Sequence, residues 1–348
     1  MEVFVIVKIL FLTTLSAIIA VAWTPLLTHF LYKYKLGKSI RSEGLTPVFN
    51  KLHIHKTGTP TMGGLIIWVT VLILILGFYY ASLIFTSDFF AQMNFLSQRQ
   101  TLLPLGALVA TALVGLFDDI LDVRSHGRGG LNIKHRLLIY TLIALAGALW
   151  FFFKLDWTVI QIPFYGFVDI GSWSILLFIF VIVGTAFSVN EIDGLDGLSG
   201  GTLLTAFGAY GAIAFFNGKF DLAALCGVII GALIAFLWFN IKPARFYMGD
   251  TGAMSLGVTL GMIAILTNQI FLLPMIGFLF VVESFSVIIQ VVSKKFRNGK
   301  KIFLSAPIHH HLEALGWPEY KIVMRFWLIS GVTAAIGLII FLIDKITT

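Results

Sequence analysis

Ten long apolar stretches constrain this chain more than any other feature of its sequence. About 20 apolar residues let a helix cross a bilayer, where every backbone polar group must be hydrogen-bonded internally. Hydrophobic residues make up 58% of the 348 residues and charged residues 12%, about half the charged share of a soluble domain. We therefore predict an all-α polytopic membrane protein, one domain over 1–348, with about ten transmembrane helices. The expected spans are 3–31, 62–85, 101–121, 136–153, 173–190, 200–216, 222–240, 251–267, 270–292 and 322–343.

Lysine and arginine are distributed unevenly between the polar segments. Of the 24 such residues, 19 lie in four segments, 32–60, 117–136, 241–250 and 293–325. Cytoplasmic loops carry the excess of positive charge, so we place these segments in the cytoplasm and, with ten spans, both termini outside. The basic run at 294–301 is either part of this anchoring or a site that attracts anionic lipid headgroups or a lipid phosphate. No nucleic-acid partner is expected.

Three smaller features complete the expected topology. The first stretch lacks the basic start and small-residue cleavage site of a signal peptide, so we expect it to be retained as a span. The extracytoplasmic segment 157–170 could form a small β-hairpin, because its β-branched residues favour strands and Pro163 is tolerated at a sheet edge. The single cysteine, Cys226, lies in a span, and its being alone excludes an intrachain disulfide.

Carboxylates gather where apolar stretches meet the predicted cytoplasmic face. Asp118 and Asp119 end the third span, Asp193 and Asp196 follow the fifth, and Asp250 precedes the eighth. Insertion does not require these acids, and ionisable groups at membrane depth are costly, so they are candidates for function. Taken alone, each motif also has a structural interpretation. The first pair could be a solvated helix end, the second a polar connection, and the last acid a helix N-cap.

Glycine-rich segments adjoin these acids. In SVNEIDGLDGLSGG, Asn190, Asp193 and Asp196 are three residues apart, and the glycines among them favour a helix break and let the backbone approach a ligand closely. HKTGTPTMGG offers Lys56 and Thr61 in what is either a phosphate-contacting loop or a flexible juxtamembrane loop, but it is not a Walker A motif. The start of the eighth span also offers free N–H groups and a positive dipole end to a phosphate.

Three histidines, His309, His310 and His311, stand side by side in APIHHHLEALGW. On a helix three consecutive side chains fan over about 200°, and in a strand they alternate, so neither arrangement directs all three at one ion. Zinc is also disfavoured because structural zinc sites space their ligands and favour cysteine together with histidine. We expect one or two of the imidazoles to donate hydrogen bonds to a phosphate or to stabilise developing charge.

Together these residue types indicate phosphoryl transfer at the bilayer surface. Carboxylate oxygens suit Mg²⁺, which commonly binds one or two of them together with a substrate phosphate. Histidine and lysine donors and a glycine-rich backbone complete the set on one membrane face. A site in the membrane implies that one substrate is a lipid.

Eight motifs carry a resemblance to a known family. They are GTPTMGG (58–64), GLFDD (115–119), DGLDGL (193–198), FLWFN (236–240), FYMGDTGAMSLG (246–257), VVESFSVIIQV (281–291), APIHHHLEALGWPE (306–319) and RFWLIS (325–330). In this order they resemble the phospho-N-acetylmuramoyl-pentapeptide transferases (the MraY family) of the polyprenyl-phosphate N-acetylhexosamine-1-phosphate transferase superfamily. The GTPTMGG and PIHHHLEALGW forms are similar to the muramoyl branch, not to the branch that uses UDP-N-acetylglucosamine.

The resemblance implies a reaction, a fold and a location. The family moves phospho-MurNAc-pentapeptide from UDP-MurNAc-pentapeptide to undecaprenyl phosphate, which forms lipid I and UMP for peptidoglycan biosynthesis, and it requires Mg²⁺. It implies ten transmembrane helices in the bacterial cytoplasmic (inner) membrane, both termini outside and an active site that faces the cytoplasm. Family members are often dimers, so a homodimer is a further expectation.

Residue roles follow from the same resemblance. Asp118 and Asp119 match the family's catalytic aspartate pair, and His309 and His310 match its functional histidines. Asp250 matches its Mg²⁺ ligand and is counted with the catalytic residues. Substrate-binding positions are matched by Lys56, Lys134, Asn190, Asp193, Gly194, Leu195, Asp196, Asn240, Tyr247 and Gln290. To these we add Thr61 and His311 from the two loops described above. Among these, the tyrosine stands where the family often has a phenylalanine that stacks on uracil, so an aromatic ring is kept.

Two positions depart from the family pattern. Asp122 stands where many members have a lysine shortly after the aspartate pair, and Glu191 is added in NEIDGLDGL, where the family has NLTDGLDGL. Neither departure removes an expected metal ligand. Both alter the charge near the expected nucleotide site, so the family's contacts with the nucleotide do not carry over at these two positions.

The mechanism and the function each have alternatives at this point. We expect an oxygen of the lipid phosphate to attack the β-phosphorus in line, with Asp118 deprotonating or orienting it; the alternative is a covalent phospho-enzyme on a carboxylate. A sister enzyme that transfers GlcNAc-1-phosphate and a cation-coupled transporter are the rival functions. The transporter is disfavoured because the acids cluster at one face and not at the bilayer midplane, where transporter sites lie.

Overall fold

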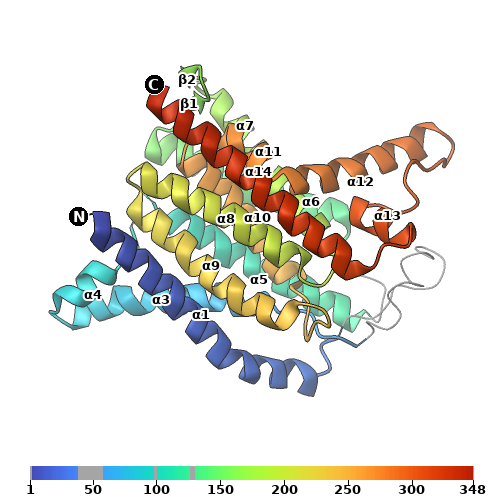
Figure 1. Cartoon of the computed structure of the whole chain (residues 1–348), viewed down its shortest axis with the longest axis horizontal. Coiled ribbons are helices and arrows are strands. Elements are labelled where there is room, and N and C mark those ends of the chain that lie inside the picture. The colour runs from blue at the N-terminus through green and yellow to red at the C-terminus, as the bar shows by residue number, and fades with distance from the viewer. Residues whose placement is uncertain (1, 38–57, 98–99, 126–129, 348) are drawn as a thin grey trace.

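The protein is a bundle of helices with one small β-hairpin (Figure 1). A computed structural model describes residues 2–37, 58–97, 100–125 and 130–347. The main helices are α1 (Glu2–Lys33), α3 (Leu65–Ile84), α5 (Leu102–Arg124), α6 (Ile133–Leu155), α7 (Trp173–Ile192), α8 (Leu198–Phe216), α9 (Phe220–Asn240), α10 (Gly249–Leu266), α12 (Phe278–Phe296) and α14 (Glu319–Thr347). Short elements are α4 (Asp88–Met93), η2 (Ile270–Leu272), α11 (Leu273–Ile276), α13 (Ile308–Ala314), β1 (Val159–Ile162) and β2 (Gly166–Asp169).

Hydropathy identified the spans, with one correction. Nine described helices are long and apolar enough to cross a membrane, and a bent pair makes ten if it counts as one span. The prediction of a continuous ninth span over 270–292 is wrong, because Ile270–Ile276 and α12 meet at 81°. Pro274 lacks an N–H group and Gly277 separates the two pieces, and such residues are the usual causes of sharp helix bends. As a result, α12 projects away from the bundle (Figure 1).

Both termini lie at the end of the bundle that carries the hairpin (Figure 1). The hairpin confirms the prediction for 157–170: β1 and β2 pair antiparallel, with Val159 opposite Asp169. Near the C-terminus, buried Asp344 accepts hydrogen bonds from Gln161 Nε2 (2.7 Å) and from the Phe164 backbone N–H (2.6 Å). The hairpin is therefore fixed to α14. The C-terminal ends of α5, α7 and α9 lie at the other end of the bundle (Figure 1).

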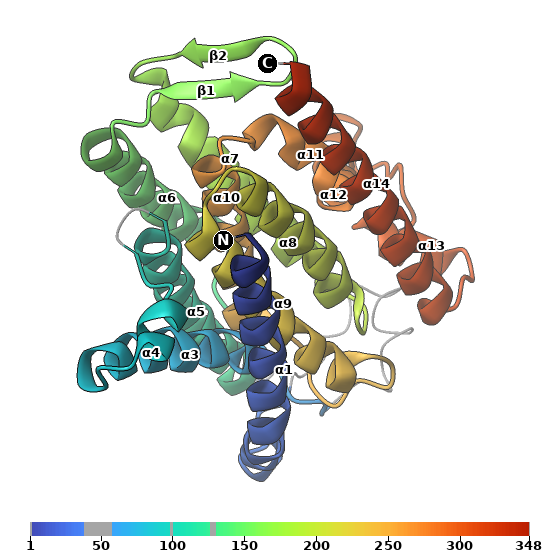
Figure 2. The ribbon, with the colours of Figure 1, turned by 60° about the vertical axis from the view of Figure 1, so that its left-hand side comes forward.

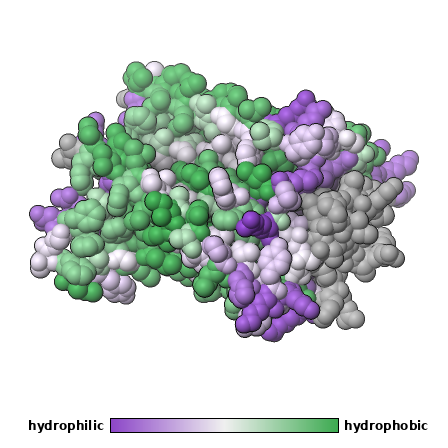
Figure 3. Space-filling view, turned by 60° about the horizontal axis from the view of Figure 1, so that its bottom comes forward, coloured by the Kyte–Doolittle hydropathy of each residue, from purple (hydrophilic) through white to green (hydrophobic). Residues whose placement is uncertain are grey.

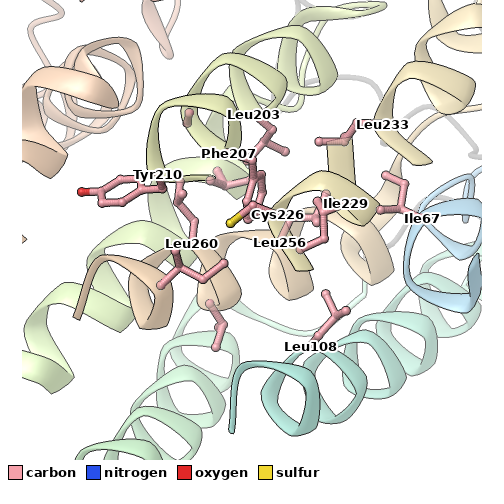
Figure 4. Packing of buried hydrophobic residues seen from close by; sticks show 14 of the residues in the cluster. Ile67, Leu108, Leu203, Phe207, Tyr210, Cys226, Ile229, Leu233, Leu256 and Leu260 are labelled. Carbon is pink, nitrogen blue, oxygen red and sulfur yellow. The ribbon is translucent and has the colours of Figure 1, made fainter. Parts of the chain in front are cut away.

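The helix α10 lies at the centre of the bundle and is buried along almost its whole length. Its Leu256 and Leu260 lie in one hydrophobic cluster with Leu203 and Phe207 of α8 and with Ile229 of α9 (Figure 4). It packs most closely against α5 and α7 (Figure 2). Where α5 meets the start of α10, the backbones touch, because a Cβ on Gly115 would lie 2.3 Å from the Asp250 carbonyl oxygen. This approach places the end of α5 beside the first turn of α10.

The surface divides as expected for a multi-pass membrane protein. On the face drawn in Figure 3, hydrophobic side chains cover the left and middle of the molecule, while hydrophilic ones gather mainly toward the right. Large apolar side chains on the outer helices are exposed, such as Phe180 and Trp238. Lipid would cover these side chains at no cost, because they need no polar partner.

We predict that Gly231→Ala destabilises the bundle and that Gly77→Ala does not. A Cβ on Gly231 of α9 would lie 2.1 Å from the Thr13 carbonyl oxygen of α1, whereas one on Gly77 of α3 meets nothing within 4 Å. Overpacking of this kind costs about 1–3 kcal/mol. Thermal unfolding in detergent checks this prediction. Equal melting temperatures for the two variants would contradict the close contact of α1 with α9.

Candidate active site

Asp119, near the end of α5, caps the first turn of α10. Its Oδ1 accepts the backbone N–H of Asp250 (3.1 Å), and its Oδ2 accepts that of Thr251 (3.0 Å). Gly249, just before, has φ +73° and would direct a Cβ to within 2.5 Å of the same carboxylate, so the turn requires glycine. The expectation that these N–H groups are free for a phosphate is therefore wrong. The helix is therefore capped by Asp119 and not by Asp250, whose alternative interpretation was an N-cap.

The segment before α3 is fixed to the same turn. The backbone N–H groups of Gly63 and Gly64 donate to the carbonyls of Tyr247 (2.7 Å) and Met248 (2.8 Å). Thr61 is thereby placed so that its hydroxyl donates to Asp119 Oδ1 at 3.2 Å. The hydroxyl of Thr61 thus contacts the cap, and the side chain is almost fully buried.

One guanidinium joins the remaining acids of the cluster. Arg136 of α6 donates to both oxygens of Asp250 (2.7 and 3.3 Å) and to Asn190 Oδ1 (3.3 Å). Its Nε also lies 2.8 Å from Asp118 Oδ2, within ion-pair distance but outside hydrogen-bond geometry. Asn190 Nδ2 donates to Asp250 Oδ1 at 2.7 Å, and the Leu131 N–H donates to Asp118 Oδ1 at 2.5 Å. Three predicted site residues therefore meet at one cation.

Arg136 was not among the predicted site residues. It stands at the first residue of a predicted span and was interpreted only as an orienting charge, although a cation at that depth needs a partner. Tyr140 lies one turn further along the same face of α6 and was also missed. Its buried hydroxyl has no hydrogen-bond partner among the residues that the structure describes. By contrast, the predicted Lys134 is exposed at the start of α6, and Lys56 lies outside the described residues.

The turn between α7 and α8 forms a second part of the site. The predicted helix break is confirmed, since α7 ends at Ile192 and α8 begins at Leu198. Asp193 Oδ1 accepts the Ser199 hydroxyl at 2.6 Å, and Leu195 is buried. The N–H of Gly197 donates to Asn240 Oδ1 at 2.9 Å.

Contacts with α14 and the 241–248 segment hold the far side of this turn. Asp196 accepts the Ala244 N–H (3.2 Å), and its own N–H donates to Glu319 Oε1 (2.9 Å). Lys242 pairs with the same Glu319 at 2.7 Å, and the Trp327 indole N–H donates to the Gly197 carbonyl at 3.1 Å. Asp196 and Asn240, both predicted as substrate-binding, therefore shape the turn in this structure.

The histidines lie on α13, and each has a different environment. His309 and Glu283 of α12 are fully buried, with Nδ1 3.0 Å from Oε2. His310 Nδ1 lies 2.7 Å from Glu313 Oε2, and its ring centroid is 4.1 Å from that of His309. His311 turns away, and its Nδ1 accepts the Leu304 N–H at 3.2 Å. The inference that the three rings do not converge on one ion agrees with these positions.

The side chain of Gln290 binds the loop between α12 and α13, and not the acid cluster. Its Oε1 accepts the N–H groups of Ile302 and Phe303, both at 3.0 Å, and its Nε2 donates to the Phe303 carbonyl at 2.8 Å. With His311, it fixes the segment that connects α12 to α13. A direct substrate contact for these two residues stays a prediction.

The donor set of the acid cluster fits a hard divalent cation. No group of three His, Cys, Asp or Glu side chains in the described part of the chain is arranged as a closed metal site. Mg²⁺ does not need such a cage, because one or two carboxylates suffice when substrate phosphates and water complete its shell. Asp118, Asp250 and the amide oxygen of Asn190 already face a common cation, the guanidinium of Arg136.

Comparisons with known proteins extend these observations. The model of Glycosyl transferase family 4 matches residues 101–268, from the start of α5 to just beyond α10. Phospho-N-acetylmuramoyl-pentapeptide-transferase of Anoxybacillus flavithermus is 40% identical over 333 residues, which are 95% of this chain and 97% of the relative. The protein of the same name from Bacillus anthracis is 39% identical over 93% of this chain and 94% of the relative. That from Chloroflexus aggregans is 37% identical over 90% and 84%.

We predict that Asp119→Ala lowers the stability of the protein. The change removes the acceptor for two backbone N–H groups of α10, and loss of an N-cap costs about 1–2 kcal/mol. Asp88→Ala, which removes an exposed acid from the first turn of α4 near the opposite end, is the control. Thermal unfolding compares the two variants. An Asp119→Ala protein that unfolds at the wild-type temperature would show that the cap contributes nothing.

Proposed function

Because the chain belongs to the phospho-N-acetylmuramoyl-pentapeptide-transferase family, we propose that it transfers phospho-MurNAc-pentapeptide from UDP-MurNAc-pentapeptide to undecaprenyl phosphate. The products are UMP and lipid I, which is an intermediate of peptidoglycan biosynthesis. The single observation that carries this function is identity of about 40% with relatives of that name over nearly the whole of both chains. The buried acid cluster at one end of the bundle is where such a reaction would take place.

The reaction needs one bond made and one broken. A phosphate oxygen of the lipid attacks the β-phosphorus of the sugar nucleotide, and the bond from that phosphorus to the bridging oxygen breaks as UMP leaves. Asp118 would orient the lipid phosphate or accept its proton, and Arg136 offers positive charge beside it. Asp119 is committed to the cap of α10. The two acids therefore contact different partners, because adjacent residues on a helix point about 100° apart.

Asp250 and Asp118, with the Asn190 amide, would hold Mg²⁺. The ion supplies electrostatic stabilisation of the diphosphate when bound. Arg136 supports this assignment because it already neutralises the same two carboxylates. It would have to give up part of these contacts to a divalent ion.

The orientation in the membrane follows from the positions of the charges. The basic residues Arg124, Lys134, Arg136, Lys242 and Arg245 lie at the same end as the acid cluster. By the positive-inside rule that end faces the cytoplasm of a bacterial inner membrane. The termini at the opposite end would then be extracytoplasmic. A homodimer stays a prediction from the family.

We predict donor selectivity for the muramoyl nucleotide. With undecaprenyl phosphate and Mg²⁺, purified protein should release UMP from UDP-MurNAc-pentapeptide and not from UDP-N-acetylglucosamine. Asp250→Ala should lower the rate by at least about 10²-fold, the scale expected when a group that stabilises charge at the reacting phosphate is removed. Release of UMP from UDP-N-acetylglucosamine alone would favour the sister enzyme, and release from neither would contradict the transferase.

We also predict that Arg136→Gln makes the protein depend on Mg²⁺ for stability. The change leaves Asp118 and Asp250 without their shared cation, so in EDTA the melting temperature should fall by about 5 °C or more. Added Mg²⁺ should then raise it more than in wild type, because a cation again neutralises both acids. Lys321→Gln, an exposed charge on α14, is the control. Equal Mg²⁺ shifts in all three proteins would count against a Mg²⁺ site here.

A further inference from the structure

We propose that Glu283 is a positioning residue that acts through His309 on the turn between α7 and α8. The proposal rests on the proposed function, because that turn carries Asp193, Gly194 and Asp196 of the expected nucleotide site. No role had been assigned to Glu283. It lies inside a predicted span, within VVESFSVIIQV, where only Gln290 was singled out.

The position of Glu283 depends on the bend in the ninth span. It lies in the second turn of α12, a few residues after the 81° break. A straight span would carry its side chain elsewhere, whereas the bent one directs it to α13. There its Oε2 lies 3.0 Å from His309 Nδ1, and both side chains are fully buried.

The opposite edge of the His309 ring contacts the turn. A Cβ on Gly194 would lie 2.2 Å from His309 Nε2 and 3.2 Å from His310 Nε2. Only glycine leaves room for the ring, so His309 packs directly on the backbone of the turn. The contact series Glu283, His309, Gly194 therefore runs from α12 through α13 to α7 and α8.

The unsatisfied polar atoms of this pair indicate a function beyond stability. Both carboxylate oxygens of Glu283 and both ring nitrogens of His309 are buried and make no hydrogen bond within the described part of the chain, so their 3.0 Å contact is at ion-pair distance but outside hydrogen-bond geometry. Buried acid–base pairs contribute little net stability compared with apolar residues of the same size, and unpaired polar atoms add cost. What the pair provides is a fixed ring position, because the Glu283 carboxylate lies 3.0 Å from Nδ1 while Nε2 packs against Gly194.

The test uses Glu283→Gln, which keeps the size of the side chain and its ability to accept an N–H but removes the charge. With UDP-MurNAc-pentapeptide as the varied substrate, kcat/KM should fall at least about 30-fold, because small misplacement of a site costs up to ~10²-fold. The Glu283→Gln, His309→Asn double variant should lose no more kcat/KM than the less active of the two single variants, as expected for residues that act as a unit.

A second readout needs no substrate. The Trp327 indole N–H donates to the Gly197 carbonyl, so its nitrogen-15 NMR signal reports the position of the turn. Glu283→Gln should shift that signal, which is assigned with Trp327→Phe. Gly194→Ala, which places a methyl group against the ring from the other side, should shift it too. If Glu283→Gln does not fold, the Gly194→Ala variant tests the contact of His309 with the turn in its place.

Asp344→Asn is the matched control, since it also converts a buried acid into an amide but lies at the hairpin end. It should leave the Trp327 signal in place and kcat/KM within about threefold of wild type. A Glu283→Gln enzyme within that range, or an unmoved Trp327 signal, overturns the proposal. If wild-type protein forms no product from the muramoyl donor, the proposed function fails, and the Trp327 signal alone decides the role of Glu283.

Discussion

The ion pairs of Arg136 with Asp118 and Asp250 hold the candidate site together. The three residues come from α6, α5 and α10, and Asn190 adds α7. Charges near membrane depth are costly unless paired, so each of these residues needs the others where it lies. A network of this kind fixes the relative positions of four helices at one end of the bundle. It also leaves a group of oxygen ligands already arranged around positive charge.

Around this cluster the structure divides its polar residues by task. Asp119 and Thr61 fix the start of α10, and Asn240 with Glu319 fixes the turn after α7. Gln290 fixes the connection between α12 and α13. Many residues expected to touch the substrate thus also hold the backbone that would bind it. This double use of side chains suits a membrane bundle, because each backbone break at the site must find hydrogen-bond partners within the protein.

The sequence predicted the fold better than the contacts within the site. Hydropathy and charge bias found the spans and the common end for both termini, because lipid imposes these patterns residue by residue. The 81° bend escaped because a broken span and a straight one have the same composition. Arg136 and Glu283 escaped although each was an ionisable residue in or at the edge of a predicted span, a signal that was available. The capping of α10 by Asp119 depends on two helices meeting at Gly115, which no local pattern reveals.

We propose that this protein moves a sugar phosphate directly onto a lipid phosphate. The most direct test uses UDP-MurNAc-pentapeptide labelled at its β-phosphorus, incubated with folded protein, undecaprenyl phosphate and Mg²⁺. We expect the label to appear in the lipid, with one UMP released for each labelled lipid and no label on the protein. Label trapped on the protein during turnover would contradict the direct route. Absence of labelled lipid from folded protein would contradict the transferase itself.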